Sequence, residues 1–298
     1  MIRIICPHVY PTLAFFGVAL IALTPSARAA GWSVQKQPAR LANGSPVLFQ
    51  VKAPVQLASL KGVWLGHGVS FSFDPRRKNW FALAGVSLET TPGRYSLELS
   101  ATPRTSGARK LSFVRKFVVV HAEYPKVELT VATKFTAPSP EQVKEIEKDR
   151  QIKQDYLNRV TSEREWSGDF EPPAQAAISD VFGTERIFNG KTQSFHQGLD
   201  FRVPSGTPVE AMNSGTVLLA RPLYFEGNCV VLDHGQGLLT IYMHLSEFKV
   251  KEGDLVKRGE EIGLSGGTGR ATGPHLHVAV RWEGIYVDPA VLLRLNLP

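Results

Sequence analysis

Short runs in which apolar and polar residues alternate constrain this chain most. That period fits strands with one buried face and does not fit a helix. Turn-forming pairs such as Asn43-Gly44, Asp74-Pro75 and Pro92-Gly93 separate the runs. The apolar positions of three such runs are Val47, Phe49 and Val51, then Val69, Phe71 and Phe73, then Tyr95, Leu97 and Leu99.

Residues 30–131 are therefore predicted to be an all-β domain. Valines at 118–120, and the alternating residues Val127, Leu129 and Val131, are expected to complete its strands. About seven short strands with this patterning predict an immunoglobulin-like β-sandwich. The sandwich would lack the usual internal disulfide, because Cys6 and Cys229 both lie outside these residues.

Residues 132–170 are predicted to connect two domains. Ser139, Pro140 and Gln142 supply a capping serine, a proline at the first helical position and a capping-box partner. We expect a charged helix from there to about Asn158. It is either a solvated spacer or a helix that packs across both domains. Its apolar stripe is interrupted and consists of Val143, Ile146, Ile152, Tyr156 and Val160.

Residues 171–298 again contain mainly strand patterns, so the whole chain is predicted to be mostly β. Within this part lie an H-x-x-x-D at His196 and Asp200, an H-x-H at His275 and His277, and a further histidine, His244. In a strand, His275 and His277 would project to the same side. Imidazole and carboxylate suit Zn²⁺, and a catalytic zinc site keeps three protein ligands and one open position.

These motifs resemble those of the lysostaphin/LytM-type zinc endopeptidases, which cut peptidoglycan cross-bridges. The resemblance covers residues 181–289 and includes further ordered matches, among them Asp233-His234-Gly235 and Gly273-Pro274 before His275. It departs from the family pattern at Val278-Ala279, where an aromatic residue and Glu often follow the H-x-H. An antiparallel-β LytM-type peptidase domain at 171–298 is the fold that the resemblance implies. The small β domain before it resembles, more weakly, one found in periplasmic members of the family.

The resemblance also implies roles for five residues. His196, Asp200 and His277 would ligate zinc, and His275 and His244 would flank the water and the scissile carbonyl. His275 is expected to be the general base and His244 to hydrogen-bond the developing oxyanion, with the two roles exchangeable. Peptidoglycan stem peptides would be the substrate, with the bond that is cut left open.

Two other readings remain at this point. One is a catalytically silent wall-binding or amidase-activator protein of the same fold, although such relatives typically lose ligands. The other is a structural β protein in which the N-terminal sandwich is the functional part. Whether the sandwich or the connector covers the cleft is left open by the sequence, and no regulatory partner is identifiable from it.

Residues 1–29 are expected to be a signal peptide, with Arg3, an apolar run from Leu13 to Leu23, and Ala27-Arg28-Ala29 as a cleavage site. The apolar run is too short for a comfortable membrane span. Removal of two arginines lowers the net charge from +7 to +5. No run of Lys or Arg suggests nucleic acid binding. A secreted chain of this kind is expected in the periplasm.

Four other residues have ordinary structural explanations. Cys229 lies in an apolar run, where a thiol acts as a small hydrophobic side chain. His234 is expected to have a structural role at the end of a strand. His67 and His121 stand alone in the N-terminal part and are expected to be surface or hydrogen-bonded histidines.

Overall fold

Strands make up most of the chain, as the alternating patterns predict. The computed structural model describes residues 31–190 and 192–298, and the predicted signal peptide lies outside them. Two α-helices occur in this part of the chain, α1 (Pro140–Leu157) and α2 (Pro289–Leu292), with a 3-10 turn η1 (Thr133–Phe135). Neither α-helix is long and apolar enough to cross a bilayer. The prediction of a mostly β chain is confirmed.

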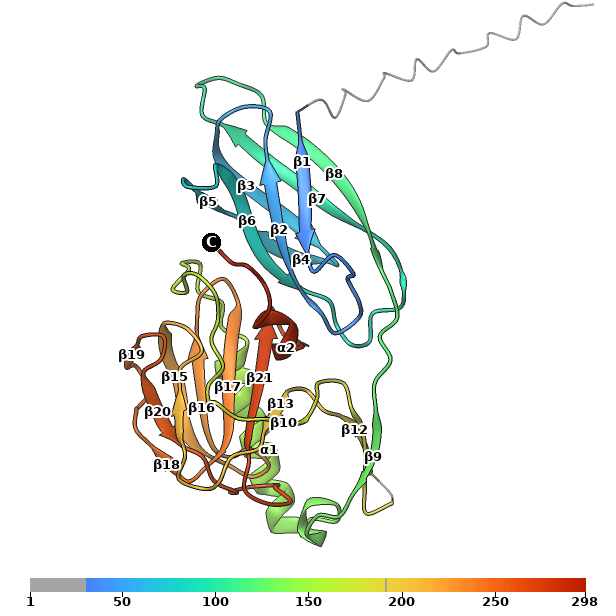
Figure 1. The fold of residues 1–298 in the computed structure, drawn as a ribbon, viewed down its shortest axis with the longest axis vertical. Coiled ribbons are helices and arrows are strands. Elements are labelled where there is room, and N and C mark those ends of the chain that lie inside the picture. Colours follow the sequence, from blue (N-terminus) through green and yellow to red (C-terminus); the bar gives the residue numbers. More distant parts are fainter. Residues whose placement is uncertain (1–30, 191) are drawn as a thin grey trace, which may run out of the picture. The chain divides into compact units, whose positions relative to one another are not determined.

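Two four-stranded antiparallel sheets form the N-terminal part (Figure 1). Their buried residues include Leu97 and three aromatic residues, Phe49, Trp64 and Phe117, whose rings pack against one another. The first sheet has the order β1 (Ser33–Gln37), β2 (Pro46–Lys52), β6 (Asn79–Gly85), β5 (Ser72–Asp74). The second has the order β4 (His67–Ser70), β3 (Leu57–Trp64), β7 (Gly93–Pro103), β8 (Leu111–Val119).

Two details of the predicted alternation are wrong. Leu48 alternates with Val47 and Phe49 in β2, so period two predicts that it faces solvent, but it is fully buried because the first sheet is also covered on its other face. Val287 and Trp282 of the C-terminal part lie against this face. A Cβ added at Gly85 in the sheet would come within 2.8 Å of Val287 and 3.2 Å of Trp282. Phe73 was placed inside but is 50% exposed, because the run breaks at Phe71 and continues as an edge strand of the other sheet.

The strand at Val127 does not complete the sandwich, contrary to the prediction. As β9 (Lys126–Leu129) it pairs in parallel with β11 (Glu185–Phe188), which pairs in turn with β12 (Thr192–Phe195). Val131 then packs with Phe135 and Phe188. The chain leaving the sandwich is therefore fastened to the segment that precedes His196.

The C-terminal part is built on an eight-stranded sheet. Its strand order is β10 (Ile178–Asp180), β13 (Leu199–Phe201), β21 (Leu276–Trp282), β17 (Leu238–Leu245), β16 (Gly227–Asp233), β15 (Gly215–Leu223), β19 (Leu255–Val256), with β22 (Ile285–Val287) on β21. A smaller sheet has the order β14 (Pro208–Glu210), β20 (Glu261–Leu264), β18 (Glu247–Phe248). The central strands β16, β17 and β21 are buried on both faces, so their side chains are held in fixed positions.

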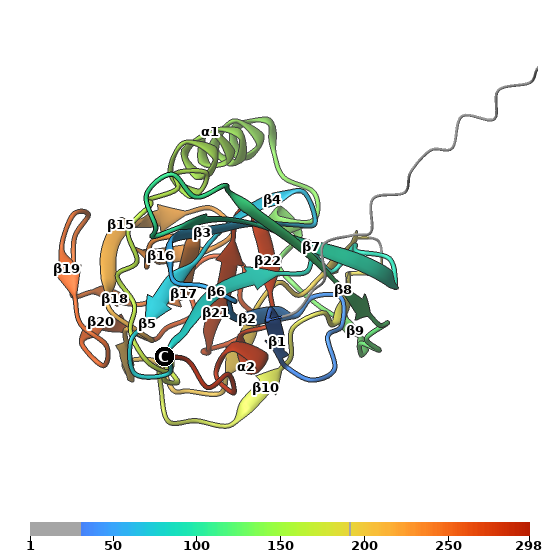
Figure 2. The ribbon, with the colours of Figure 1, turned by 90° about the horizontal axis from the view of Figure 1, so that it is seen from above.

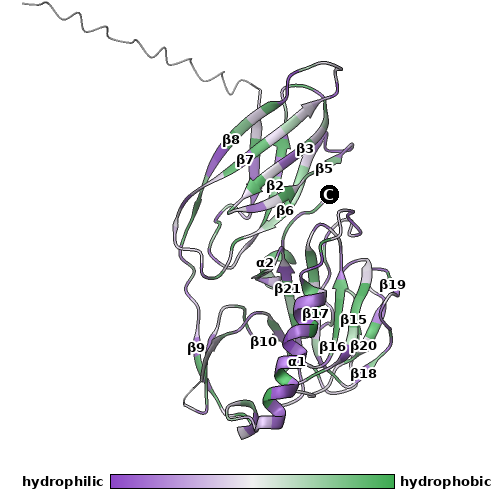
Figure 3. Ribbon diagram, turned by 180° about the vertical axis from the view of Figure 1, so that it is seen from behind, coloured by the Kyte–Doolittle hydropathy of each residue, from purple (hydrophilic) through white to green (hydrophobic). Residues whose placement is uncertain are grey.

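Helix α1 covers one face of the large sheet (Figure 2). The predicted capping box at Ser139 and Gln142 is present. The predicted apolar stripe is wrong at Val143 and Val160, which are exposed, and most of the helix surface is hydrophilic (Figure 3). Leu157 anchors the helix end among apolar residues of the sheet, a burial worth about 1.5–3 kcal/mol.

Candidate metal centre

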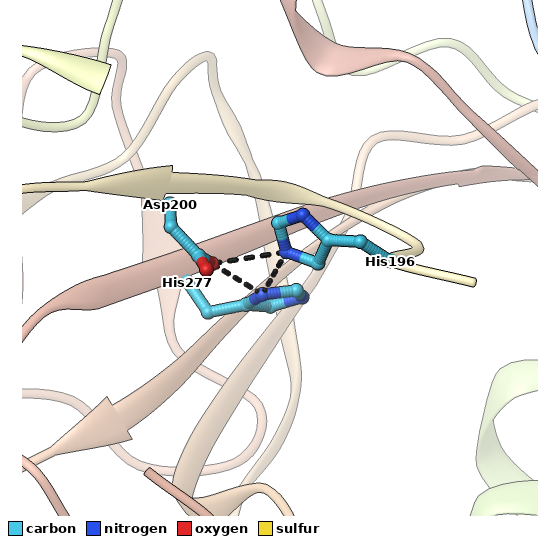
Figure 4. Close-up of side chains that lie close together, drawn as sticks. All are labelled: His196, Asp200 and His277. Atoms are coloured by element: carbon cyan, nitrogen blue, oxygen red, sulfur yellow. Dashed lines mark hydrogen bonds and ion pairs between the residues drawn. The ribbon is translucent and has the colours of Figure 1, made fainter. Parts of the chain in front are cut away.

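Three side chains that offer electron pairs meet beside the large sheet. Asp200 in β13 lies directly opposite His277 in β21 in their antiparallel ladder. His196 follows β12 and precedes β13, so the H-x-x-x-D spans a turn that enters a strand. Figure 4 shows the three side chains pointing toward one another.

The three donor atoms form a small buried triangle. Nε2 of His196 lies 3.0 Å from Oδ1 of Asp200 and 3.0 Å from Nδ1 of His277. Nδ1 of His277 lies 2.8 Å from the same carboxylate oxygen. All three residues are buried, so water does not screen their interactions well.

Gly198 is required by this packing. A Cβ at this position would lie 2.5 Å from Nε2 of His277 and 2.6 Å from the backbone oxygen of Val278. Those separations are too short for any side chain. The glycine inside the H-x-x-x-D therefore lets the turn approach the facing strand closely enough for the triangle to form.

The hydrogen bonding around His196 fits a cation at the centre of the triangle. Nδ1 of His196 lies 2.8 Å from the backbone oxygen of Val181, and a carbonyl oxygen only accepts. Nδ1 therefore carries the hydrogen, and in the neutral ring Nε2 presents a lone pair to the carboxylate of Asp200. Two electron-pair donors in contact repel unless a proton or a metal ion lies between them.

Arg186 holds the carboxylate of Asp200 in place from the other side. Its Nη2 donates to Oδ2 of Asp200 at 2.7 Å and to Oδ2 of Asp180 at 2.5 Å. Burial alone would raise the pKa of Asp200, but the adjacent imidazoles of His196 and His277 outweigh it and lower that pKa well below its usual value. Asp200 is therefore a carboxylate under ordinary conditions, as a metal ligand must be.

His244 and His275 lie next to the triangle. Their ring centroids are 4.7 Å apart, and the His244 ring is 6.0 Å from that of His277. Nδ1 of His244 donates to the oxygen of Thr268 at 2.8 Å, and Nδ1 of His275 donates to the oxygen of Gly273 at 2.9 Å. In the neutral form of each ring, Nε2 is thus left without a hydrogen.

Burial opposes a positive charge on His244. Desolvation, followed by the nearby His277 and His275, lowers the pKa of His244 to about 3. The backbone of His244 has a positive φ of 64°, which a non-glycine residue adopts only where neighbouring contacts enforce it. One such contact is the hydrogen bond from the His244 amide to the oxygen of Glu226, at 2.9 Å.

This part of the chain matches a known protein family and a solved structure. Residues 194–289 match the model of peptidase family M23, and this segment contains all five histidine and aspartate residues described above. The solved catalytic domain of lysostaphin from Staphylococcus simulans is 35% identical, with 40% of this chain and 93% of that domain covered and a TM-score of 0.37.

Residues 194–289 of this chain belong to peptidase family M23.

Other family M23 proteins show how much of the chain is shared. The peptidoglycan DD-endopeptidase ShyA of Vibrio cholerae is 46% identical over 122 residues, which are 41% of this chain and 28% of ShyA. The chain thus matches less than a third of that relative. A solved Pseudomonas aeruginosa structure assigned to peptidase M23 is 28% identical with a TM-score of 0.64, covering 85% of this chain and 95% of that one. This likeness extends to residues outside the M23 segment.

Residues outside the M23 segment also line the cavity at the site. The cavity has a volume of about 250 Å³, and part of its wall is formed by Leu129 and Val131, from the end of the predicted sandwich, and by Lys153 of the predicted connector. Nothing in the sequence indicated this contribution, because it depends on the pairing of β9 with β11. A connector that is only a solvated spacer is therefore ruled out.

Helix α1 supports the loop beside His244. Oδ2 of Asp149 accepts from the amide of Tyr224 at 2.6 Å, and Nζ of Lys153 donates to Oε1 of Glu226 at 2.6 Å. Because Glu226 also receives the His244 amide, the helix is linked to a site residue through a single loop. The sequence predicts a charged helix here, but no local pattern pairs Asp149 and Lys153 with the 224–226 loop.

The remaining singled-out residues of the M23 segment lie in the core. His234 is fully buried, with Nδ1 2.7 Å from the oxygen of Ser214 and Nε2 2.7 Å from Oγ1 of Thr240. Cys229 is buried among apolar side chains, which raises the pKa of its thiol. At the departure from the family pattern, Val278 is buried and Ala279 borders the site cavity.

Proposed function

We propose that this protein is a zinc-dependent endopeptidase that hydrolyses peptide cross-links of bacterial peptidoglycan in the periplasm. The observation that carries the proposal is the buried triangle of His196, Asp200 and His277, with two further imidazoles beside it. Membership of family M23 supports peptide hydrolysis. The name of the relative ShyA supports peptidoglycan as the substrate and action outside the cytoplasm.

The residues of the triangle would hold the ion. Two imidazole nitrogens and one carboxylate oxygen are a common ligand set of catalytic zinc sites. When bound, the ion supplies Lewis-acid polarisation of the scissile carbonyl and lowers the pKa of water. Arg186 orients the Asp200 carboxylate through its hydrogen bond to Oδ2, in the way that outer partners of metal ligands generally do.

His275 acts as the general base in this proposal. Its Nε2 has no hydrogen in the neutral ring, because Nδ1 donates to Gly273. It takes one proton from the attacking water as the water oxygen bonds to the scissile carbon. The same proton then passes to the leaving amine as the C–N bond breaks, so the base is regenerated.

His244 orients the same water by accepting a hydrogen bond at Nε2. The sequence suggested a different role, donation to the developing oxyanion. That role requires a protonated ring, which the burial of His244 opposes. The oxyanion role stays a prediction, and the geometry favours His244 as an acceptor.

Hydrolysis of defined muropeptides tests the proposal. The metal-loaded protein is incubated with purified sacculi and with a soluble cross-linked muropeptide dimer, and products are identified by mass spectrometry. We expect monomers from the dimer, their loss on chelation and their recovery with Zn²⁺. A metal-loaded protein that leaves every cross-link intact would instead support a catalytically silent wall-binding role.

A further inference from the structure

The two parts of the chain carry opposite net charge. Residues 31–131 contain fourteen Lys and Arg against five Asp and Glu, a net charge of +9. Residues 132–298 contain eighteen Lys and Arg against twenty-two Asp and Glu, a net charge of −4. The modest overall charge therefore conceals a strongly basic N-terminal part, and such a region attracts anionic polymers.

A groove opens on this basic part, far along the chain from the metal centre. It has a volume of about 660 Å³ and lies where the edge strand β5 and strand β6 meet the segment 53–58. The amide of Arg104 donates to the oxygen of Gln56 at 2.9 Å, which fixes one wall to the end of β7. The groove is thus bordered by strands and a tied loop and is largely preformed.

Exposed apolar side chains form part of the groove. Phe73 is 50% exposed and Val55 is 49% exposed, although the alternation of the sequence predicted Phe73 to be buried. The rings of Phe73 and Trp80 are partners across the β5–β6 ladder, with centroids 5.4 Å apart. Phe73 is exposed and Trp80 is half-buried, and exposed apolar surface in a groove is a common mark of a binding site.

Two cations complete the groove, and no acid opposes them. Lys78 and Arg104 are exposed and line it, whereas none of its lining residues is Asp or Glu. Within residues 31–190 and 192–298, no carboxylate lies within ion-pair distance of either cation. Both side chains are therefore available to an anionic ligand, and the aromatic rings offer it an apolar surface.

We propose that this groove binds an acidic glycan, namely a peptidoglycan strand, and holds the protein on its polymeric substrate. The proposal rests on the proposed function for the identity of the polymer. The negative face of an aromatic ring attracts the C–H groups on the face of a sugar ring. The carboxylates of the stem peptides would pair with Lys78 and Arg104.

Co-sedimentation with insoluble sacculi measures this binding directly. The metal-loaded protein is compared with a Lys78→Gln/Arg104→Gln variant and with Phe73→Ser. All three positions are exposed or half-exposed, so the fold does not depend on them. The matched control is Lys61→Gln/Lys116→Gln, which removes the same charge from exposed positions outside the groove.

We expect the bound fraction to fall at least about fivefold in both groove variants and to change less than twofold in the control. Hydrolysis of a soluble muropeptide dimer should be equal in all four proteins, whereas solubilisation of sacculi should fall in the groove variants through a higher KM. Equal losses in the groove and control variants would mean general charge attraction and would overturn the proposal. So would unchanged sacculus binding in the groove variants.

Two further measurements distinguish this proposal from membrane binding and from the proposed endopeptidase function. Vesicles of phosphatidylglycerol test a membrane surface as the ligand, and binding to vesicles that depends on the groove more than binding to sacculi would overturn the glycan assignment. A wild-type protein that sediments with sacculi through the groove but cleaves no dimer would refute the proposed endopeptidase function and leave the groove standing.

Discussion

Asp200 and His277 are direct partners across the ladder of β13 and β21, with Oδ1 and Nδ1 2.8 Å apart. This register brings the carboxylate of Asp200 and the imidazole of His277 into contact within a regular ladder. We expect Asp200→Ala and His277→Ala to lose the metal, measured as bound zinc after dialysis. His121→Ala, an exposed change in the N-terminal part, is the control and should keep the wild-type content. Stoichiometric zinc in either ligand variant would show that the ligand set is wrong.

His275 should be separable from the metal ligands. Because its Nδ1 is bonded to Gly273 and its ring lies against His244, His275→Ala removes a proton acceptor and none of the three triangle atoms. We expect zinc content to stay at the wild-type level and kcat to fall by about 10²–10⁴, the usual contribution of a general base. Assays of both quantities on one preparation test this. Full activity would remove His275 from the mechanism.

Gly198 tests whether the close approach of the turn is needed. In Gly198→Ala the new methyl group would overlap His277 and the oxygen of Val278, and such overpacking costs about 1–3 kcal/mol. We expect a lower midpoint of urea unfolding and weaker zinc binding. Gly68→Ala is the control, because a Cβ there meets nothing within 4 Å. Equal stability of the two variants would contradict the reading.

The sequence predicted the grouping of His196, Asp200 and His277 better than it predicted the surroundings. The H-x-x-x-D and the H-x-H are local patterns, and the choice of these three residues followed from their resemblance to the motifs of a known family. The contribution of Lys153 was hidden, since it requires α1 to lie on the sheet and the 224–226 loop to bend toward it. A pairing between β9 and β11, almost sixty residues apart, leaves no local pattern.

Alternation also has limits that Leu48 and Phe73 make clear. Alternation with a period of two residues predicts which side chains share a face of a strand, and it assumes that one face is exposed to solvent. Leu48 is buried because the first sheet is covered on both sides, and Phe73 is exposed because it lies in an edge strand. Both outcomes depend on which sheets pack together, and that is decided by residues far away in the chain.

The Lys153–Glu226 pair should connect α1 to catalysis. Its charged atoms are 2.6 Å apart and the Glu226 side chain is largely buried, so Lys153→Met leaves a buried carboxylate unpaired. We expect stability to fall by about 1–3 kcal/mol and kcat to fall with it, because Glu226 holds the His244 amide. Adding Glu226→Gln should restore part of both, and Lys148→Met on the exposed side of the helix should have no effect. The double variant shows whether Lys153 and Glu226 act as a pair. Strictly additive losses would mean that they act independently and would contradict the prediction.

His234 should make the fold sensitive to acid. Burial lowers the pKa of His234 to about 4, whereas in the unfolded chain it is near 6.5. The unfolded state therefore binds a proton first, so the stabilising contribution is complete above about pH 6.5 and is lost as the pH falls toward 4. A difference of about 2.5 pKa units corresponds to roughly 3 kcal/mol. Urea unfolding of the metal-free protein between pH 7 and 4 measures this. In His234→Gln, which has no titrating ring, stability should fall less steeply over that window, and parallel curves would show that His234 does not carry the effect.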